Sequence, residues 1–419
     1  MSSDPFASNS WPDAVGDVAV FPGIRTTNGI TVHTQNTITV GEMLMITGTH
    51  CWVGDDWLPS TLVFDNSNQA ARIRIDRAKE DGYMYSGLGI WGSTRVDFVG
   101  DIEIITRPLP SNLAMYATCA VFRIEDDVVI KGSGRLLKDG AGMLWVGGQA
   151  DGAYFHPQIL LDSPLVVQDG WLCVYPEAII EPAVQINSDA RFTHTGQCAI
   201  DVDVILNGGM YWPNFANQSR YTNCGSVTVL DPSCIRANSN ACIFLEGEVN
   251  GTSELINDMN GIVNIVGTIS PGLGPSNCIG KLTITTRLHT QSIIGLADNQ
   301  ATLEVDVDEP SVPSGADYDE LICNGRTTVE LGYMNLLVRL GNFTPEATCT
   351  VVIASPGAVH GEFSSVQWEP PEYAGSVVCD DSSVTLIMSD VPEPMSGVVA
   401  LALCVYGFRA SRSRRNWRA

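Results

Sequence analysis

Closely spaced aspartates are the feature of this chain best suited to chemistry. They occur as Asp55–Asp56, Asp126–Asp127, Asp201 with Asp203, Asp306 with Asp308, and Asp317 with Asp319. General acid and base catalysis at a glycosidic bond needs two carboxyl groups about 5–9.5 Å apart. Residues i and i+2 of a strand point to the same side and lie close enough to meet this requirement. Clustered carboxylates are also the ligands that a hard cation such as Ca²⁺ prefers.

The sequence around two of these pairs favours a third interpretation. Asp201 and Asp203 alternate with Val202 and Val204, and the stretch Glu304-Val-Asp-Val-Asp repeats the alternation. This pattern is typical of a half-buried strand whose valines point inward and whose acids point to solvent. We therefore predict solvent-exposed acidic faces, with no catalytic residue and no assigned metal ligand. Calcium binding stays open as an alternative.

No motif elsewhere in the sequence indicates an enzyme. The histidines are widely spaced, at His33, His50, His156, His194, His289 and His360. The chain lacks the His-Glu-x-x-His of zinc hydrolases, the Gly-x-Ser-x-Gly nucleophile elbow and a phosphate-binding glycine loop. Its 12 cysteines include no Cys-x-x-Cys pair, which disfavours zinc and leaves two alternatives: buried thiols, or one or two disulfides between stacked turns. We predict a non-enzymatic protein without a cofactor.

Aromatic residues offer another kind of binding surface. The candidates are Tyr83, Tyr85, Trp91, Trp145, Tyr211, Trp212 and Tyr221. Such rings could stack against sugars, but aromatic side chains more often fill a core or a corner of the fold. Core packing is the prediction, and contact with polysaccharide is the alternative.

Composition narrows both the partners and the fold class. Asp plus Glu number 47 against 23 Lys plus Arg, and the net charge is −24. Such a surface repels nucleic acid, so DNA or RNA binding is disfavoured. The 40 glycines, with Val, Ile and Thr throughout, indicate many short strands joined by turns.

The last 29 residues divide into three parts. Pro392, Glu393 and Pro394 come first, followed by an uncharged apolar run over 397–408. A basic end carries Arg409, Arg412, Arg414, Arg415 and Arg418. About 20 apolar residues are needed to cross a bilayer, so the run is short and would form only a marginal membrane helix. Arginines directly after it would stay cytoplasmic and leave the body of the protein outside.

This order of parts resembles the PEP-CTERM sorting signal of Gram-negative bacteria. The resemblance implies export, retention in the inner membrane by the tail, and processing near Pro392-Glu-Pro394 by an exosortase-type membrane protease. It further implies release into, or attachment to, extracellular polysaccharide at the cell surface. Two prolines keep the motif extended, as a protease substrate requires.

The N-terminus departs from that pattern. Residues 1–10 contain neither basic residues nor an apolar core, so no signal peptide is recognisable. Either the export signal lies upstream of Met1, which we expect, or it has been lost. We expect residues 1–9 to be disordered and the folded domain to begin near residue 10.

The body carries a second resemblance. The stretch from Lys138 to Gly147 resembles the autotransporter-associated β-strand repeat, and Leu144 and Val146 would point into a solenoid core. Two glycine-containing segments, at 247–251 and 266–274, lie about 20 residues apart, a plausible length for one coil. The order of segments near both ends of the body also resembles autotransporter-like passenger proteins.

These observations predict an all-β protein. We expect a right-handed parallel β-helix, or β-solenoid, over 10–270, a C-terminal β-rich cap over 271–390, and a sorting tail with a short hydrophobic helix over 391–419. Ser270-Pro-Gly272 would mark the boundary of the cap. The predicted function is that of an exported structural or adhesive surface protein. The alternatives are a carbohydrate-active β-helix enzyme, either a lyase or a glycoside hydrolase, and a calcium- or polysaccharide-binding module.

Overall fold

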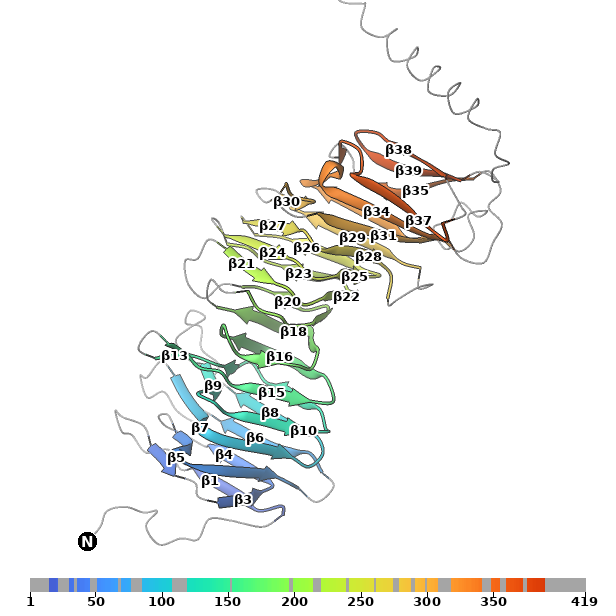
Figure 1. Cartoon of the computed structure of the whole chain (residues 1–419). Helices are drawn as coiled ribbons and strands as arrows, with labels where there is room; N and C mark the ends of the chain where they lie inside the picture. Colours follow the sequence, from blue (N-terminus) through green and yellow to red (C-terminus); the bar gives the residue numbers. More distant parts are fainter. Residues whose placement is uncertain are drawn as a thin grey trace, which may run out of the picture.

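The protein is built almost entirely of β-strands, as predicted. The computed structural model describes residues 15–21, 30–33, 36–45, 51–66, 69–76, 85–107, 119–150, 153–195, 199–213, 220–238, 241–259, 261–273, 279–287, 291–297, 300–307, 318–340, 348–354, 359–371 and 375–388. Within these ranges every element is a strand except the 3-10 turn η1 (Leu331–Tyr333). Figure 1 shows the strands stacked in coils along one elongated, bent body.

Each coil contributes strands to three faces, which we call A, B and C. Face B runs without a break through β1 (Val18–Phe21), β4 (Glu42–Met45), β6 (Ala71–Asp76), β8 (Ile102–Arg107), β11 (Leu136–Asp139), the first part of β16 (Leu165–Val174), the first part of β18 (Val184–His194), β19 (Val204–Asn207), β22 (Val227–Asp231), β25 (Val249–Gly251), β28 (Thr268–Pro271), β31 (Ala301–Val307), β34 (Met334–Leu340) and β37 (Ser365–Glu369). All these pairings are parallel.

Face C is equally continuous. It comprises β2 (Ile30–His33), the first parts of β5 (Cys51–Phe64) and β7 (Tyr85–Phe98), β9 (Cys119–Ile124), β12 (Met143–Val146), the second parts of β16 and β18, β20 (Met210–Tyr211), β23 (Ser233–Ile235), β26 (Glu254–Asn257), β29 (Lys281–Thr286), β32 (Glu320–Gly325) and β35 (Thr348–Ala354). A two-stranded antiparallel hairpin, β13 (Gln149–Ala150) with β14 (Ala153–Tyr154), lies outside this ladder.

Face A is divided into two parts. The lower part stacks β3 (Asn36–Val40), the second parts of β5 and β7, β10 (Val129–Gly132), β15 (Gln158–Leu161) and β17 (Ile179–Ile180). The upper part stacks β21 (Arg220–Asn223), β24 (Cys242–Leu245), β27 (Ile262–Ile265), β30 (Gln291–Ile294), β33 (Thr327–Glu330) and β36 (Val359–His360). The upper part forms a separate six-stranded sheet.

The coil spacing agrees with the repeat suggested by the sequence. Val249 pairs with Ile269, so the two predicted segments stack directly on each other. Leu144 and Val146 are both fully buried, as expected for strand β12. Other coils are longer, because residues are inserted between faces: Asp101 binds Arg135 across 34 residues.

The core is one continuous column of aliphatic side chains. Valine, isoleucine and leucine at alternate strand positions point inward from all three faces, and Phe64 meets Phe98 edge-on at 5.8 Å. Removing such a side chain from water contributes about 1.5–3 kcal/mol. Since each coil packs mainly on its two neighbours, this stabilisation accumulates coil by coil.

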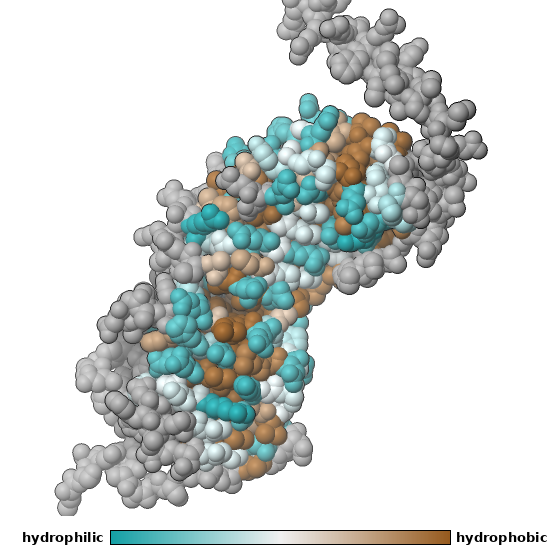
Figure 2. Space-filling model, in the orientation of Figure 1, coloured by the Kyte–Doolittle hydropathy of each residue, from teal (hydrophilic) through white to brown (hydrophobic). Residues whose placement is uncertain are grey.

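The parallel ladder continues through the predicted boundary at residue 270. Ser270 and Pro271 belong to β28, which pairs with β25 below and β31 above. Beyond this point, β39 (Ser383–Met388) is antiparallel to both β35 and β38 (Gly375–Cys379). Figure 2 shows a hydrophobic area at this end of the body. Val378 of β38 and Ile387 of β39 are exposed apolar residues.

Both predicted termini lie outside the described residues. These are the segment 1–9 and the tail 391–419, which includes the predicted short hydrophobic helix. In the part of the chain that the structure describes, no helix is long and apolar enough to cross a membrane.

A column of glycines lets the coils approach closely at the corner between faces A and B. A Cβ atom added to Gly247 would lie 2.2 Å from the carbonyl oxygen of Gly225, and one added to Gly267 would lie 2.1 Å from that of Gly247. These contacts involve backbone atoms, so a side chain at either position would push the stacked coils apart.

Replacing Gly247 should therefore destabilise the stack. We expect Gly247→Ala to lower the free energy of unfolding by about 1–3 kcal/mol, measured by urea denaturation. Gly332→Ala is the matched control, because an added Cβ at Gly332 meets nothing within 4 Å. Equal stability of the two variants would show that the corner does not need glycine.

His194 is a buried titratable group inside the solenoid. Its ring is fully buried and lies 5.8 Å from the Tyr211 ring and 5.4 Å from the Tyr221 ring. Neither ring nitrogen has a hydrogen-bond partner among the residues that the structure describes. Burial lowers the pKa of His194 to about 3, from an ordinary value of 6.5, so the folded protein holds the neutral imidazole.

This burial makes stability depend on pH. Between pH 6.5 and pH 3 the unfolded chain binds a proton at His194 that the folded chain excludes, so stability falls as the pH falls through this window. His194→Phe should remove that dependence. The unfolding free energy of the variant minus that of the wild type should therefore be about 2 kcal/mol larger at pH 5 than at pH 8. Denaturation curves at both pH values measure it.

The control for this experiment is His360→Phe, because His360 is exposed. We expect this variant to follow the wild type at both pH values. If wild type and His194→Phe differ in unfolding free energy by the same amount at pH 5 and at pH 8, the folded protein does not exclude the proton from His194.

Candidate functional site: an acidic groove where face A is interrupted

The interruption of face A lies between residues 177–181 and 199–203. Below it, Ile179 donates its N–H to Pro157 and Glu181 donates to Ile159, so this strand is bonded to the preceding coil. Above it, Ile200 donates to Thr222 and Cys224 donates to Ile200, so that segment is bonded to the following coil. No pairing between described residues joins the two segments across face A.

Asn223 fixes the upper side of the interruption. Its side chain is fully buried and accepts hydrogen bonds from the N–H groups of Val202 (3.2 Å) and Gly225 (3.2 Å). Its amide also donates to the carbonyl of Val202 at 3.0 Å. The side chain of Asn223 thus adds to the backbone hydrogen bonds of Ile200 and holds 199–203 against the coil above.

The lower side is a short strand between two prolines. Pro176 and Pro182 flank β17, and proline cannot donate a hydrogen bond to a ladder. Glu177 has a positive φ of 70°, which turns the chain just before the strand. Neither proline can supply an N–H to a neighbouring coil at its own position.

Faces B and C stay paired at the same level. Val184 donates to the carbonyl of Asp203 at 2.7 Å, and β18 pairs with both β19 and β20. The two coils are therefore joined at the corner near Asp203, and they separate along face A from that corner.

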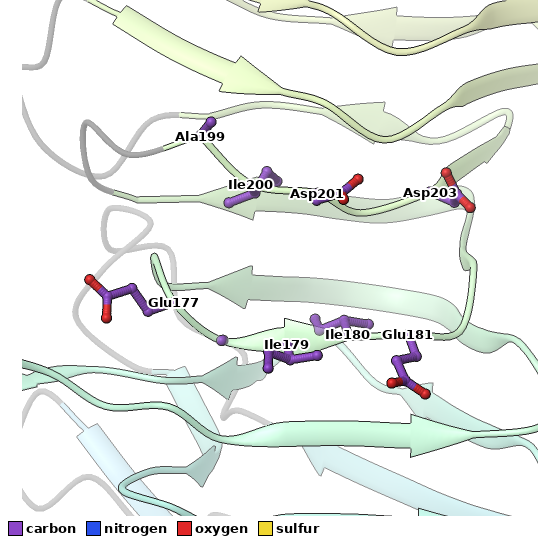
Figure 3. Close-up of a pocket in the computed structure, with 9 residues that line it drawn as sticks. Glu177, Ile179, Ile180, Glu181, Ala199, Ile200, Asp201 and Asp203 are labelled. Atoms are coloured by element: carbon purple, nitrogen blue, oxygen red, sulfur yellow. The ribbon is translucent and has the colours of Figure 1, made fainter.

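The separation forms a groove of about 480 Å³, shown in Figure 3. Its lining consists of Glu177, Ala178, Ile179, Ile180, Glu181, Ala199, Ile200, Asp201 and Asp203. The apolar members include the buried Ile180 and Ile200, whereas all four acids are exposed at the rim. The lining contains no cationic residue, so the groove concentrates negative charge.

Two of the four acids already have partners. Glu177 Oε2 lies 2.7 Å from His156 Nε2. Asp203 Oδ1 accepts hydrogen bonds from the backbone N–H (2.7 Å) and hydroxyl (2.8 Å) of Ser226. Glu181 and Asp201 make no side-chain hydrogen bond or ion pair with a described residue, so both carboxylates are available to a ligand.

The predicted alternation is present at this site. Asp201 and Asp203 are exposed, and Val202 and Val204 are buried. The sequence did not indicate that the ladder is interrupted beside this acid pair, because the interruption depends on Glu181 and its neighbours in the preceding coil. The only local signals were the two prolines around 179–180.

The expectation of a solvated face is wrong at Asp306. This residue is only 6% exposed and Asp319 only 1%. Asp319 accepts hydrogen bonds from the backbone N–H groups of Gly280 (2.7 Å) and Asp306 (2.9 Å), so it ties two segments together. The local pattern misled because Asp306 lies against Asp319, which a later segment of the chain supplies.

The remaining acids divide between turns and undescribed positions. Asp126 accepts a hydrogen bond from Gly92 N–H at 2.9 Å, and Asp127 is exposed. Asp308, Asp317 and the side chains of Asp55 and Asp56 lie outside the described residues.

The aromatic candidates mostly fill the core. Tyr211, Tyr221 and Trp212 are buried. Trp145 is half-buried; it stacks on Tyr175 at 5.1 Å and lies under the guanidinium of Arg123. Trp91 is also half-buried, and Tyr83 and the side chain of Tyr85 are outside the described residues. The described rings therefore form no row of open platforms for sugars.

Lys138 is a buried cation that sequence reasoning missed. It begins the predicted repeat, yet it is fully buried and donates to the carbonyls of Asp139 (3.1 Å), Gly140 (2.5 Å) and Asp169 (2.9 Å). Burial lowers the pKa of Lys138 to about 7. Its role is to satisfy carbonyls of two adjacent coils.

Neither metal ligation nor disulfide bonding is seen among the described residues. The free thiols there are Cys51, Cys173, Cys224, Cys234, Cys242, Cys323 and Cys379. Burial raises the pKa of Cys51 and of Cys323 to about 12, so both are inert thiols. The described ranges hold no group of three or more His, Cys, Asp or Glu placed to bind a metal ion. The predicted sorting residues, Pro392 to Pro394 and the five arginines, lie outside the described part.

Comparison with known proteins gives little further information. No protein-family model matches the chain, and no curated protein does. Among solved structures, the crystal structure of the Haemophilus influenzae Hap adhesin aligns over 89% of this chain and 48% of that chain, with 12% identity and a TM-score of 0.23. The chain thus spans about half the length of that adhesin.

Removing the Asn223 side chain should loosen the upper side of the groove. Asn223→Ala leaves the polar groups of Val202 and Gly225 buried without these partners, so we expect a loss of about 2–3 kcal/mol in unfolding free energy. Amide hydrogen exchange should accelerate first at residues 200–203. Asn207→Ala, which removes a single bond to Asn187, is the control and should cost about 1 kcal/mol or less. A loss confined to other coils would contradict this role.

Proposed function

We propose that this protein is an exported, non-enzymatic surface protein in which the β-solenoid serves as a rigid structural or adhesive scaffold. The observation that carries the proposal is the continuous parallel ladder of faces B and C, which gives a long, stiff body. Repeat scaffolds of this kind offer extended surfaces for contact. We further propose that the coils are right-handed, the usual hand of parallel crossover connections.

The sorting tail supplies the second part of the proposal. Pro392-Glu-Pro394, the apolar run and the arginine-rich end suit a segment that holds the chain in the inner membrane until an exosortase-type protease acts. Extracellular polysaccharide is then the proposed neighbour of the mature protein. The acidic body suits an environment rich in cations and cationic partners.

Cleavage of the tail can be tested directly. In cells that contain the processing enzyme, intact-mass measurement should find a mature chain that lacks the segment from about residue 391 onward. Pro392→Ala with Pro394→Ala should stop cleavage but preserve anchoring, because the apolar run is unchanged. Replacing the five arginines by glutamate should weaken the membrane orientation. A mature chain that still ends at Ala419 would refute the sorting signal.

A second test asks whether the protein cleaves polysaccharides. Incubation of the purified protein with acidic and neutral polysaccharides should yield neither new reducing ends nor unsaturated products. Turnover that disappears in Asp201→Asn would instead favour the carbohydrate-active alternative, since Asp201 and Asp203 are an exposed acid pair. Asp162→Asn, at an exposed acid that does not line the groove, is the control.

A further inference from the structure

The interruption of face A leaves two sheet edges facing each other. In a parallel ladder, successive residues of a strand direct their backbone groups to opposite neighbours. Ile179 and Glu181 bond to the coil below, so the N–H and C=O groups of Ile180 face the groove. Ile200 and Val202 bond to the coil above, so the same groups of Asp201 face the groove from the other side.

We infer that this groove binds an extended, positively charged segment of a partner polypeptide, which adds a β-strand between the two edges. Strand addition to an exposed sheet edge gains affinity from main-chain hydrogen bonds and specificity from alternate side chains. Here one inserted strand would pair with Ile180 on one side and with Asp201 on the other. The inference depends on the groove alone and is independent of the sorting tail.

The side chains around the groove define the sequence that it accepts. Buried Ile180 and Ile200 lie on the inner side and exposed Glu181 and Asp201 on the outer side. An inserted strand would therefore place apolar residues inward and Lys or Arg outward, in strict alternation. Glu181 and Asp201 are the two rim carboxylates left available by the described side chains. Figure 3 shows that they come from the two opposite sides of the groove.

Charge complementarity distinguishes this occupant from others. The four rim acids would repel an acidic strand, and the apolar inner side would gain nothing from a bare cation. The acids are distributed along both sides of the groove and do not converge on one point, and no metal-binding group occurs among the described residues. A cationic β-strand uses the backbone edges, the isoleucines and the acids together.

The experiment uses the full chain and a synthetic peptide of alternating lysine and valine, roughly nine residues long. Binding is measured by calorimetry, and amide hydrogen exchange is followed at Ile180 and Asp201. We expect saturable binding, slower exchange at both amides, and affinity that falls with added salt. A peptide of alternating glutamate and valine should not bind.

A modified peptide and a double variant of the protein distinguish strand pairing from charge attraction. N-methylation of alternate peptide amides keeps every charge but removes hydrogen-bond donors, and should weaken binding tenfold or more if the peptide pairs as a strand. Glu181→Gln with Asp201→Asn should weaken binding about fivefold. Asp162→Asn with Asp189→Asn makes the same change in net charge at exposed acids outside the groove lining and should have little effect.

Several results would overturn the inference. Equal binding of the N-methylated peptide would mean that charge alone attracts it. Equal weakening by the two double variants would mean that it binds no particular site. Calcium binding at the same residues, with no peptide binding, would identify a cation site in place of a strand site. Each of these outcomes leaves the test of tail cleavage unaffected.

Discussion

The hydrogen bonding between successive coils is the constraint on which the rest of this structure depends. Every strand of faces B and C is paired in parallel with the coil below and the coil above, up to the two ends of the stack. This pairing sets a fixed spacing of about 4.7–4.9 Å between coils. Side chains at corners must then fit that spacing, and glycine occupies positions such as Gly247 where two backbones meet too closely for a Cβ.

The groove is the place where this constraint is relaxed on one face only. Prolines lie on either side of the two-residue strand β17, and Asn223 binds the upper segment through its side chain. Because faces B and C remain paired, the molecule keeps its continuity while face A opens. At this level the backbone groups of Ile180 and Asp201 face the groove, next to acids that strand alternation places outward.

Buried polar groups inside the solenoid are accommodated in different ways. Lys138 donates to three carbonyls, and Asp319 accepts from two backbone N–H groups, so each replaces water with protein partners. His194 has no such partners and is instead kept neutral within a stack of aromatic rings. The first two groups stabilise contacts between segments, whereas the histidine makes stability sensitive to acid.

The sequence by itself determined the class of the fold and much of its local pattern. Alternation at Val202 and Val204, the inward positions of Leu144 and Val146, and the spacing of Gly247 from Gly267 all follow from residue types along one chain segment. The tertiary structure alone decided which coil lies beside which. Exposure of Asp201 and burial of Asp306 come from similar local sequences, and the difference arises where a later segment places Asp319 against Asp306. The groove likewise joins Glu181 to Asp201 across a full coil, and a contact between coils leaves no periodic signal within either segment.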